Sequence, residues 1–338
     1  MILSIRNVGS HMVKEPSESM SLNRVPALTT PIDVPIVYTF VGIQLLSCLG
    51  LVALLLSAML SSKIKRLATW YSFCASWILS CLSYSLLTLG GQQTAPSPNA
   101  PLCAVQAALI YSVPPLTSST TLALLIQILL NFPNPAAETP TVTTTKVLCG
   151  LLIGPYVIFL VLFLGVIVFE VQNPETLVKT VQGTYCNSTD PAWLKVAFSL
   201  VAVVSVVILL VQGHLVTQLY ALRRRVVKGE SVASPSLTLT IRGFLFVCIG
   251  AITLTIAMVF TIKGVQNLAF DIVVSTFPLM AFLTFGTQRD LLCLWSSPFV
   301  TMHKRLSMSS RMVRESILFG KRISTQPPSR SLPIKSPI

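Results

Sequence analysis

The stretch between Cys186 and Arg242 constrains the fold more than any other part of the chain. From Trp193 to Leu219 it is dominated by Val, Leu, Ala and Ile, and it contains no acidic residue. A helix of these 27 residues would rise about 40 Å, and the hydrocarbon core of a bilayer is about 30 Å thick. The stretch therefore predicts a helix that crosses a membrane.

Residues on either side give this span a predicted direction. Before it, Asn187 begins an Asn-Ser-Thr acceptor pattern for N-glycosylation, which is meaningful only outside the cytosol. After it come Arg223, Arg224, Arg225 and Lys228, and basic residues gather on the cytoplasmic side of membrane proteins. Both signals predict that the chain enters the membrane from outside and leaves it on the inside.

The composition excludes a soluble globular domain. Of the 338 residues, 53% are hydrophobic and only 10% are charged, whereas soluble domains carry about 25% charged residues. The net charge of +13 is of the kind found in nucleic-acid-binding proteins. Here the basic residues flank apolar segments, so we expect a lipid bilayer as the partner and no nucleic acid.

Seven apolar segments are each long enough to cross a bilayer, and the short loops between them are typical of an antiparallel bundle. They form one predicted transmembrane domain, 35–286, between a flexible extracellular tail, 1–34, and a basic, amphipathic cytoplasmic tail, 287–338. The predicted fold class is an all-α membrane protein with a seven-transmembrane helix bundle. The expected spans are about 35–60, 67–90, 103–130, 147–169, 193–219, 243–262 and 267–286.

The distribution of basic residues predicts the orientation of this bundle. Most of the 24 Lys and Arg residues fall on alternate loops and in the C-terminal tail. By the positive-inside rule, this asymmetry places the N-terminus outside and the C-terminus in the cytoplasm. The basic residues left on the outer side are Arg6, Lys14, Arg24, Lys179, Lys195 and Lys263.

Two of the eight cysteines face the predicted oxidising side. Cys103 lies at the top of the third span, and Cys186 lies in the long loop before the fifth. Extracellular cysteine pairs form disulfides, so we expect a bridge that fixes this loop over the third span, with two free thiols as the alternative. Cys293 lies just past the last span, and the others fall inside spans: Cys48, Cys74, Cys81, Cys149 and Cys248.

The sequence shows no pattern typical of a catalytic or metal site. The three His residues are far apart, and no carboxylate pair or Cys cluster has metal-ligand spacing. A Gly-rich phosphate-binding loop is also missing from the sequence. We therefore expect no enzyme activity, no metal and no cofactor.

Asp271 is the one acidic residue expected below the membrane surface, about one turn into the seventh span. An ionisable group at such a depth indicates a functional site. Gln106, Tyr111, Tyr84 and Lys263 are expected at the same outer level, where the five side chains would line a pocket for a polar or cationic ligand. The alternative is that Asp271 sits at the headgroup level and pairs with Lys263.

The third span combines Pro114 and Pro115 with the hydroxyl run Thr117–Thr121. Proline removes backbone donors and bends helices, and neighbouring hydroxyls can bind the freed carbonyls. Five consecutive hydroxyls cover every face of a helix, so some of them are expected only to pack against other helices.

The predicted cytoplasmic face is basic. Arg223, Arg224 and Arg225 end the fifth span, and Arg242 begins the sixth. These residues are expected to anchor the topology. The further interpretation is that they also form a docking surface for an acidic partner.

The C-terminal tail carries candidate modification sites. Cys293 lies in a short amphipathic segment along the membrane, which makes it a candidate for palmitoylation. Ser307 and Ser324 follow Lys-Arg pairs and are candidate phosphorylation sites. The alternative for both serines is an unmodified tail.

The seven spans, the outside N-terminus, Cys103, Cys186 and the amphipathic segment after the seventh span together resemble a G-protein-coupled receptor. The segment Phe285–Asp290 is similar to the end of the seventh helix in fungal receptor-like seven-helix proteins. The resemblance implies a plasma-membrane receptor that senses an extracellular ligand and signals to a heterotrimeric G protein or another acidic cytosolic partner.

Two motifs place the chain outside the rhodopsin-like family. The end of the third span, Gln127–Asn131, lacks the Arg of that family, and Thr276–Met280 keeps only the Pro of its seventh-helix motif. The seventh span also lacks the Lys that binds retinal in microbial rhodopsins. The alternative function is a seven-helix transporter or lipid exporter, although no repeat between halves supports it.

Overall fold

The computed structural model describes residues 34–61, 66–95, 98–131, 145–180, 183–227, 241–252 and 268–287. The chain divides into two compact units, Met1–Gly286 and Thr287–Ile338, and the described helices belong to the first. Some predictions lie outside the described residues: the N-terminal tail up to residue 33, and Lys263, Cys293, Ser307 and Ser324.

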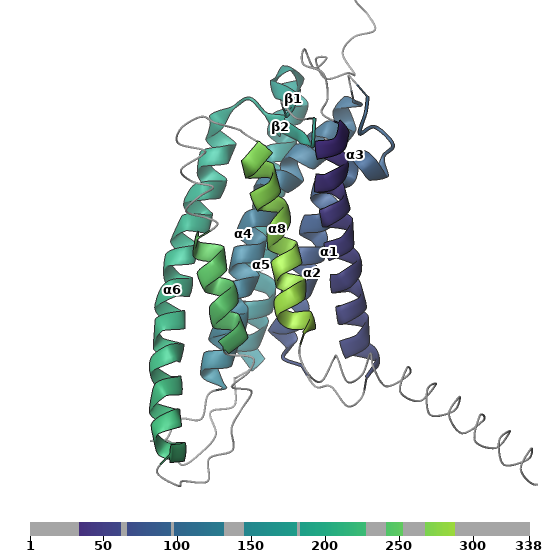
Figure 1. Ribbon diagram of the computed structural model, residues 1–338. Helices are drawn as coiled ribbons and strands as arrows, with labels where there is room; N and C mark the ends of the chain where they lie inside the picture. Colours follow the sequence, from purple (N-terminus) through teal and green to yellow (C-terminus); the bar gives the residue numbers. More distant parts are fainter. Residues whose placement is uncertain are drawn as a thin grey trace, which may run out of the picture. The chain divides into compact units, whose positions relative to one another are not determined.

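Helices make up most of the described chain, and the helices of the first unit run side by side (Figure 1). A small antiparallel pair of strands joins two of them. In chain order the elements are α1 (Val34–Leu60), α2 (Ala68–Tyr84), α3 (Leu86–Leu89), α4 (Ala100–Leu130), α5 (Thr145–Gln172), the 3₁₀ turn η1 (Pro174–Thr176), β1 (Leu177–Lys179), β2 (Cys186–Ser188), α6 (Pro191–Val227), the helix Ile241–Ile252 and α8 (Leu268–Gly286).

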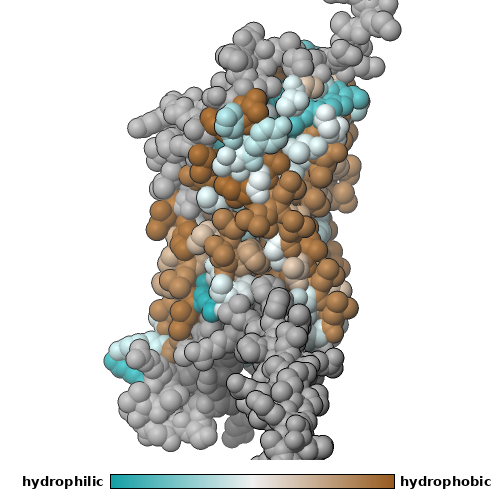
Figure 2. Space-filling view, turned by 45° about the vertical axis from the view of Figure 1, so that its right-hand side comes forward, coloured by the Kyte–Doolittle hydropathy of each residue, from teal (hydrophilic) through white to brown (hydrophobic). Residues whose placement is uncertain are grey.

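Four of the described helices are long and apolar enough to cross a membrane: α1, α4, α5 and the Pro191–Ala221 part of α6. Large exposed apolar side chains gather on α1, α5 and α6, and Figure 2 shows a broad brown zone over the helices. A surface of this kind is stable only in an apolar medium. The chain is therefore an all-α membrane protein. In the regions of the predicted sixth and seventh spans, the described residues include the apolar helical segments Ile241–Ile252 and Asp271–Gly286.

The predicted second span, 67–90, contains two consecutive helical elements, and helical hydrogen bonds from Ser85 to Cys81 and from Leu89 to Ser85 run through the position between them. α2 ends at Tyr84, and the single turn α3 follows after Ser85. The amide of Gln106 on α4 donates to the carbonyls of Ser83 (3.0 Å) and Tyr84 (3.5 Å). This side chain therefore supplies donors to backbone carbonyls where α2 ends inside the protein.

α4 is the most buried of the four long helices, and it packs against α5, α2 and α6. Some of its hydroxyls pack against a neighbouring helix, as predicted, and others bind carbonyls of their own helix. Thr120 shares a hydrogen bond of 2.8 Å with Ser76 of α2, whereas Thr117 and Ser118 donate to the carbonyls of Pro114 and Pro115 in their own helix. The polar character of this span therefore stabilises a central helix.

Candidate functional site

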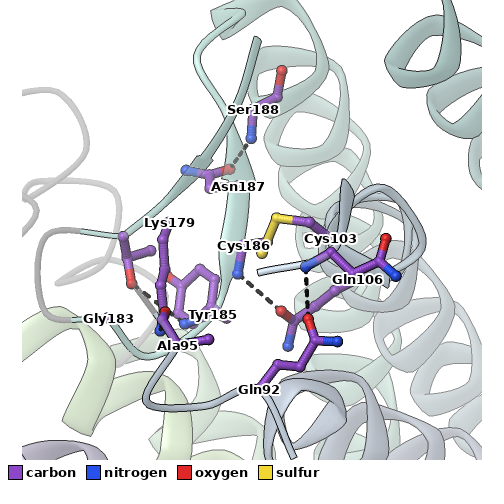
Figure 3. The surroundings of a disulfide bond; sticks show 12 residues. Gln92, Ala95, Cys103, Gln106, Lys179, Gly183, Tyr185, Cys186, Asn187 and Ser188 are labelled. Atoms are coloured by element: carbon purple, nitrogen blue, oxygen red, sulfur yellow. Dashed lines mark hydrogen bonds between the residues drawn. A yellow bond between two sulfur atoms is a disulfide. The ribbon is translucent and has the colours of Figure 1, made fainter. Parts of the chain in front are cut away.

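The predicted disulfide is present between Cys103 at the start of α4 and Cys186 on β2. Their Cα atoms are 5.3 Å apart, the sequence separation is 83 residues, and both side chains are fully buried. β1 and β2 pair antiparallel, with Lys179 opposite Cys186 and Val178 opposite Asn187. The hairpin Leu177–Ser188, named the outer hairpin because the sequence predicts it on the extracellular side, is thus covalently attached to the central helix (Figure 3).

Gln106 is the first of three polar residues, named here the hairpin anchors, that fix the outer hairpin. Besides its two bonds to α2, it accepts a hydrogen bond of 2.9 Å from the backbone N–H of Cys186, beside the disulfide (Figure 3). All the polar atoms of its side chain are engaged in these bonds. Gln106 is fully buried between α2, α4 and β2 and is not among the residues that line the cavity described below.

Asp271 is the second hairpin anchor. Its carboxylate accepts hydrogen bonds from the hydroxyls of Thr184 (2.9 Å) and Tyr185 (3.3 Å), and the residue is only 4% exposed. Burial and the nearby Asp271 charge raise the pKa of Tyr185 well above its ordinary value, so its hydroxyl stays protonated and donates. Asp271 therefore joins α8 to the hairpin; its predicted partner Lys263 lies outside the described residues.

Lys179 is the third hairpin anchor. Its Nζ donates to the carbonyls of Gln93 (2.5 Å) and Ala95 (3.3 Å), in the loop that follows α3. The side chain is buried, and burial lowers the pKa of its ammonium group. Together, the anchors attach the hairpin to three separate parts of the chain: the end of α2, the α3–α4 loop and α8.

A cavity of about 970 Å³ lies directly beneath the outer hairpin. Residues of α2, α4, α6, the helix Ile241–Ile252, α8 and the hairpin line it. Such a volume is near the upper end of the range of about 300–1,000 Å³ for small-molecule sites. Of the five residues predicted to form a pocket, Tyr84 and Tyr111 line this cavity, Gln106 and Asp271 do not, and Lys263 lies outside the described residues.

The two tyrosines shape the end of the cavity next to the hairpin. Tyr111 hydrogen-bonds through its hydroxyl to the Asn187 side chain and accepts from the backbone N–H of Ser188 at 3.3 Å. Tyr84 packs edge-on against Phe40 and Tyr185, with ring centroids 5.9 and 5.4 Å apart. This end of the cavity therefore carries hydroxyl and amide groups on a rigid aromatic base.

Asn187, the predicted glycosylation site, is partly buried and lines the cavity. Its Oδ1 accepts from the Tyr111 hydroxyl and from the backbone N–H of Ser188 at 2.9 Å. An N-linked glycan is attached through the side-chain nitrogen, whereas both of these contacts use the side-chain oxygen. Glycosylation at Asn187 stays a prediction.

An aromatic cluster, defined as Phe73, Trp77, Phe246, Phe277 and Phe285, forms the other end of the cavity. Trp77, Phe246 and Phe277 line the cavity itself. Phe73 and Phe285 continue the cluster away from the hairpin, with Phe73–Phe285 ring centroids 5.0 Å apart and Phe246–Phe285 centroids 6.0 Å apart. The cluster joins α2, α8 and the helix Ile241–Ile252. This cluster was not predicted from the sequence.

The predicted docking arginines lie at the end of the helices away from the hairpin. Arg224 is exposed and donates to the hydroxyl of Tyr220 at 2.8 Å, with its guanidinium 4.5 Å from that ring centre. Arg242 is half-buried and donates to the carbonyl of Thr284 on α8 at 3.1 Å. Arg224 thus belongs to an open surface, whereas Arg242 belongs to a contact between two helices. The side chains of Arg223 and Arg225 lie outside the described residues.

Within the described residues, no group of three or more His, Cys, Asp or Glu side chains is placed to hold a metal ion. The cavity has the outer hairpin at one end and the aromatic cluster at the other. No protein-family model matches the chain, and a search of curated proteins finds no match.

Proposed function

We propose that the protein is a seven-helix receptor of the plasma membrane, which binds an extracellular ligand in the cavity and signals through its basic face. The observation that carries this proposal is that the cavity and the aromatic cluster share residues. Trp77 and Phe246 line the cavity and also belong to the aromatic cluster, 6.0 Å apart between ring centroids. A ligand in the cavity would therefore contact side chains that pack the helices farther along the bundle.

The helix arrangement supports the proposed seven-span orientation. α2, the helix Ile241–Ile252 and α8 lie where the second, sixth and seventh spans are expected. The disulfide-linked hairpin lies at one end of α6, and exposed Arg224 lies near its other end. An extracellular hairpin and cytoplasmic arginines agree with the compartment rules for disulfides and basic residues.

The proposed signal is a change in packing at the cytoplasmic end. Phe246 lies four residues, about one helical turn, after Arg242, and Arg242 binds the carbonyl of Thr284 on α8. Ligand contact with Phe246 would favour one of two packings of this helix against α8. The ligand shifts the equilibrium only by its difference in affinity for the two packings.

The proposed cytoplasmic partner is a heterotrimeric G protein or another acidic protein, because the exposed end of α6 is basic. Complementary charge steers association between such surfaces. Arg224 is the described residue that offers this charge to a partner.

The test is recovery of cytosolic partners with the full-length protein from cells, beside a variant with Arg223, Arg224 and Arg225 changed to Gln. A matched control removes three positive charges from the predicted outer tail, by changing Arg6, Lys14 and Arg24 to Gln. An N-terminal epitope, stained on intact cells, checks the orientation of every variant.

We expect a G-protein subunit with the native chain and the control, and its loss with the α6 variant. Equal recovery with all three proteins would contradict the docking surface. Absence of any partner, together with transport of a lipophilic substrate across vesicles, would favour the transporter alternative.

A further inference from the structure

We infer that the cavity takes an uncharged, elongated amphiphile: one hydrogen-bonding polar end beside the outer hairpin and an apolar chain that reaches the aromatic cluster. This inference rests on the proposed assignment of the cavity as the ligand site. It replaces the polar or cationic ligand expected from the sequence, because the acid on which that expectation depended does not line the cavity.

The first argument concerns charge. Among the described residues that line the cavity, Asp190 is the only charged one. It lies at the hairpin end, where its Oδ1 accepts from the backbone N–H of Ala192 at 2.8 Å and caps the first turn of α6. A buried ion without a partner is strongly unfavourable. The described walls thus offer no counter-ion to a carboxylate, and the one carboxylate that an ammonium group could meet, that of Asp190, lies at the hairpin end and already caps α6.

The second argument concerns the walls. Thr117, Ser118 and Thr121 line the cavity on α4, and each donates its hydroxyl proton to a carbonyl of the same helix. These side chains therefore present few free donors to a ligand. On α6 the facing positions recur at helical spacing and are mostly apolar, with Ala197, Val201 and Ile208 among them. An alkyl or isoprenoid chain matches both walls.

The third argument concerns the two ends. Tyr111, Asn187 and Ser188 place hydroxyl, amide and backbone groups at the hairpin end of the cavity. Asn187 uses its Oδ1 for neighbours in the protein, so its amino group is the donor that this cluster supplies to a ligand. A ligand hydroxyl, ester or ketone would accept from it. The floor, formed by the rings of Trp77 and Phe246, is mainly apolar, and the indole nitrogen of Trp77 is buried.

The expected length of the ligand follows from the length of the α4 segment that lines the cavity. Tyr111 and Thr121 mark the hairpin end and the deep end of the α4 lining. Ten residues of helix separate them, which corresponds to about 15 Å at ~1.5 Å per residue. A long-chain alcohol or ester fits this distance, whereas a small polar metabolite would leave most of the apolar wall uncovered.

The experiment uses the full-length protein in nanodiscs of phosphatidylcholine and three diazirine probes of one chain length. The probes end in an alcohol, a carboxylate or a trimethylammonium group. Photolabelled residues are mapped by mass spectrometry, with and without excess unlabelled probe. Val161, an exposed residue on α5, reports unspecific labelling from the lipid and should be labelled by all three probes.

We expect the alcohol to label the α4 and α6 walls in a saturable way, and the two charged probes to label them at least about tenfold less. Val201→Phe, which places a bulkier side chain on the α6 wall of the cavity, should abolish saturable labelling. Val203→Phe is the matched control, because Val203 is 64% exposed on the same helix. It should leave the labelling unchanged.

A charge placed on the wall should reverse the selectivity. In Ser205→Asp, a carboxylate on the α6 wall should raise labelling by the trimethylammonium probe relative to the alcohol by about tenfold. Wall labelling by a charged probe equal to that by the alcohol in the native protein would overturn the inferred ligand class. Equal effects of the two valine variants would overturn the inferred location.

Partner recovery, measured on the same native protein, separates this inference from the proposed function. Arginine-dependent recovery of a G-protein subunit without saturable labelling would overturn the ligand class and leave the receptor proposal standing. Saturable labelling by the alcohol without any cytosolic partner would support the ligand class and contradict the receptor proposal.

Discussion

The two ends of the bundle are held together by different kinds of contact. At the hairpin end, a disulfide and the three hairpin anchors attach one short loop to α2, α4, α8 and the α3–α4 loop. At the arginine end, the aromatic cluster and the bond from Arg242 to Thr284 join the helix Ile241–Ile252 to its neighbours. Covalent and directional contacts define one geometry, whereas aromatic packing tolerates several.

This difference suits a protein whose cavity keeps one geometry at the hairpin end while the helix packing at the arginine end changes. Burial of apolar rings is non-directional, and ring pairs are favourable in both offset-stacked and edge-to-face arrangements over centroid distances of about 4.5–7 Å. Hydrogen bonds at the hairpin are directional, and breaking them leaves buried polar groups without partners. The comparison predicts that changes at the hairpin cost stability, while changes in the aromatic cluster alter signalling more than stability.

The largest expected effect is on the disulfide. Changing Cys103 and Cys186 together to Ala releases a loop of 83 residues, and closing a loop of this size contributes about 4–5 kcal/mol. We expect a clear fall in the melting temperature of the purified protein, followed by circular dichroism. Cys149→Ala, at an exposed position of α5, is the control. An equal melting temperature in both variants would contradict a structural role for the bridge.

The next largest effect is expected at Asp271. Asp271→Ala removes the acceptor of two buried hydroxyls, those of Thr184 and Tyr185, and each unsatisfied group costs about 1–3 kcal/mol. Hydrogen exchange of the outer hairpin should become faster, while exchange of α5 should not change. Asp190→Ala removes an acid that caps α6 and contacts neither hydroxyl. If Asp190→Ala accelerated hairpin exchange as much, the anchor role of Asp271 would be wrong.

A smaller effect on stability is expected at Phe246. Phe246→Leu keeps an apolar side chain but removes ring contacts with Phe73, Trp77 and Phe285, for a loss of about 1 kcal/mol. Because these contacts join the cavity floor to the neighbouring helices, we expect recovery of the cytosolic partner without ligand to rise about fivefold. Phe244→Leu is the matched control, since Phe244 is exposed on the same helix. Identical recovery with both variants would argue against transmission through the cluster.

The sequence predicted the parts of the molecule that depend on composition and compartment. Apolar length indicated the long helices, and exposure to an oxidising side identified Cys103 and Cys186 as a pair. The sequence did not reveal the partners of Asp271, because Thr184 and Tyr185 lie 87 and 86 residues away along the chain. It also could not separate Phe246 from Phe244: both are phenylalanines in one apolar helix, and only packing distinguishes the buried ring from the exposed one.

The smallest expected effect concerns Lys179 and alkaline pH. Burial lowers the pKa of this ammonium group below its value in the unfolded chain, so between the two pKa values the unfolded state binds more protons than the folded state. Stability then rises as pH increases through that interval, and the penalty for the buried charge is fully present below it.

Hairpin hydrogen exchange, corrected for its intrinsic pH dependence, should slow as pH rises through this interval in the native protein. In Lys179→Met this slowing should disappear, because no titrating group is left beside the carbonyls of Gln93 and Ala95. Slowing of the same size in the variant would assign the pH dependence to another group.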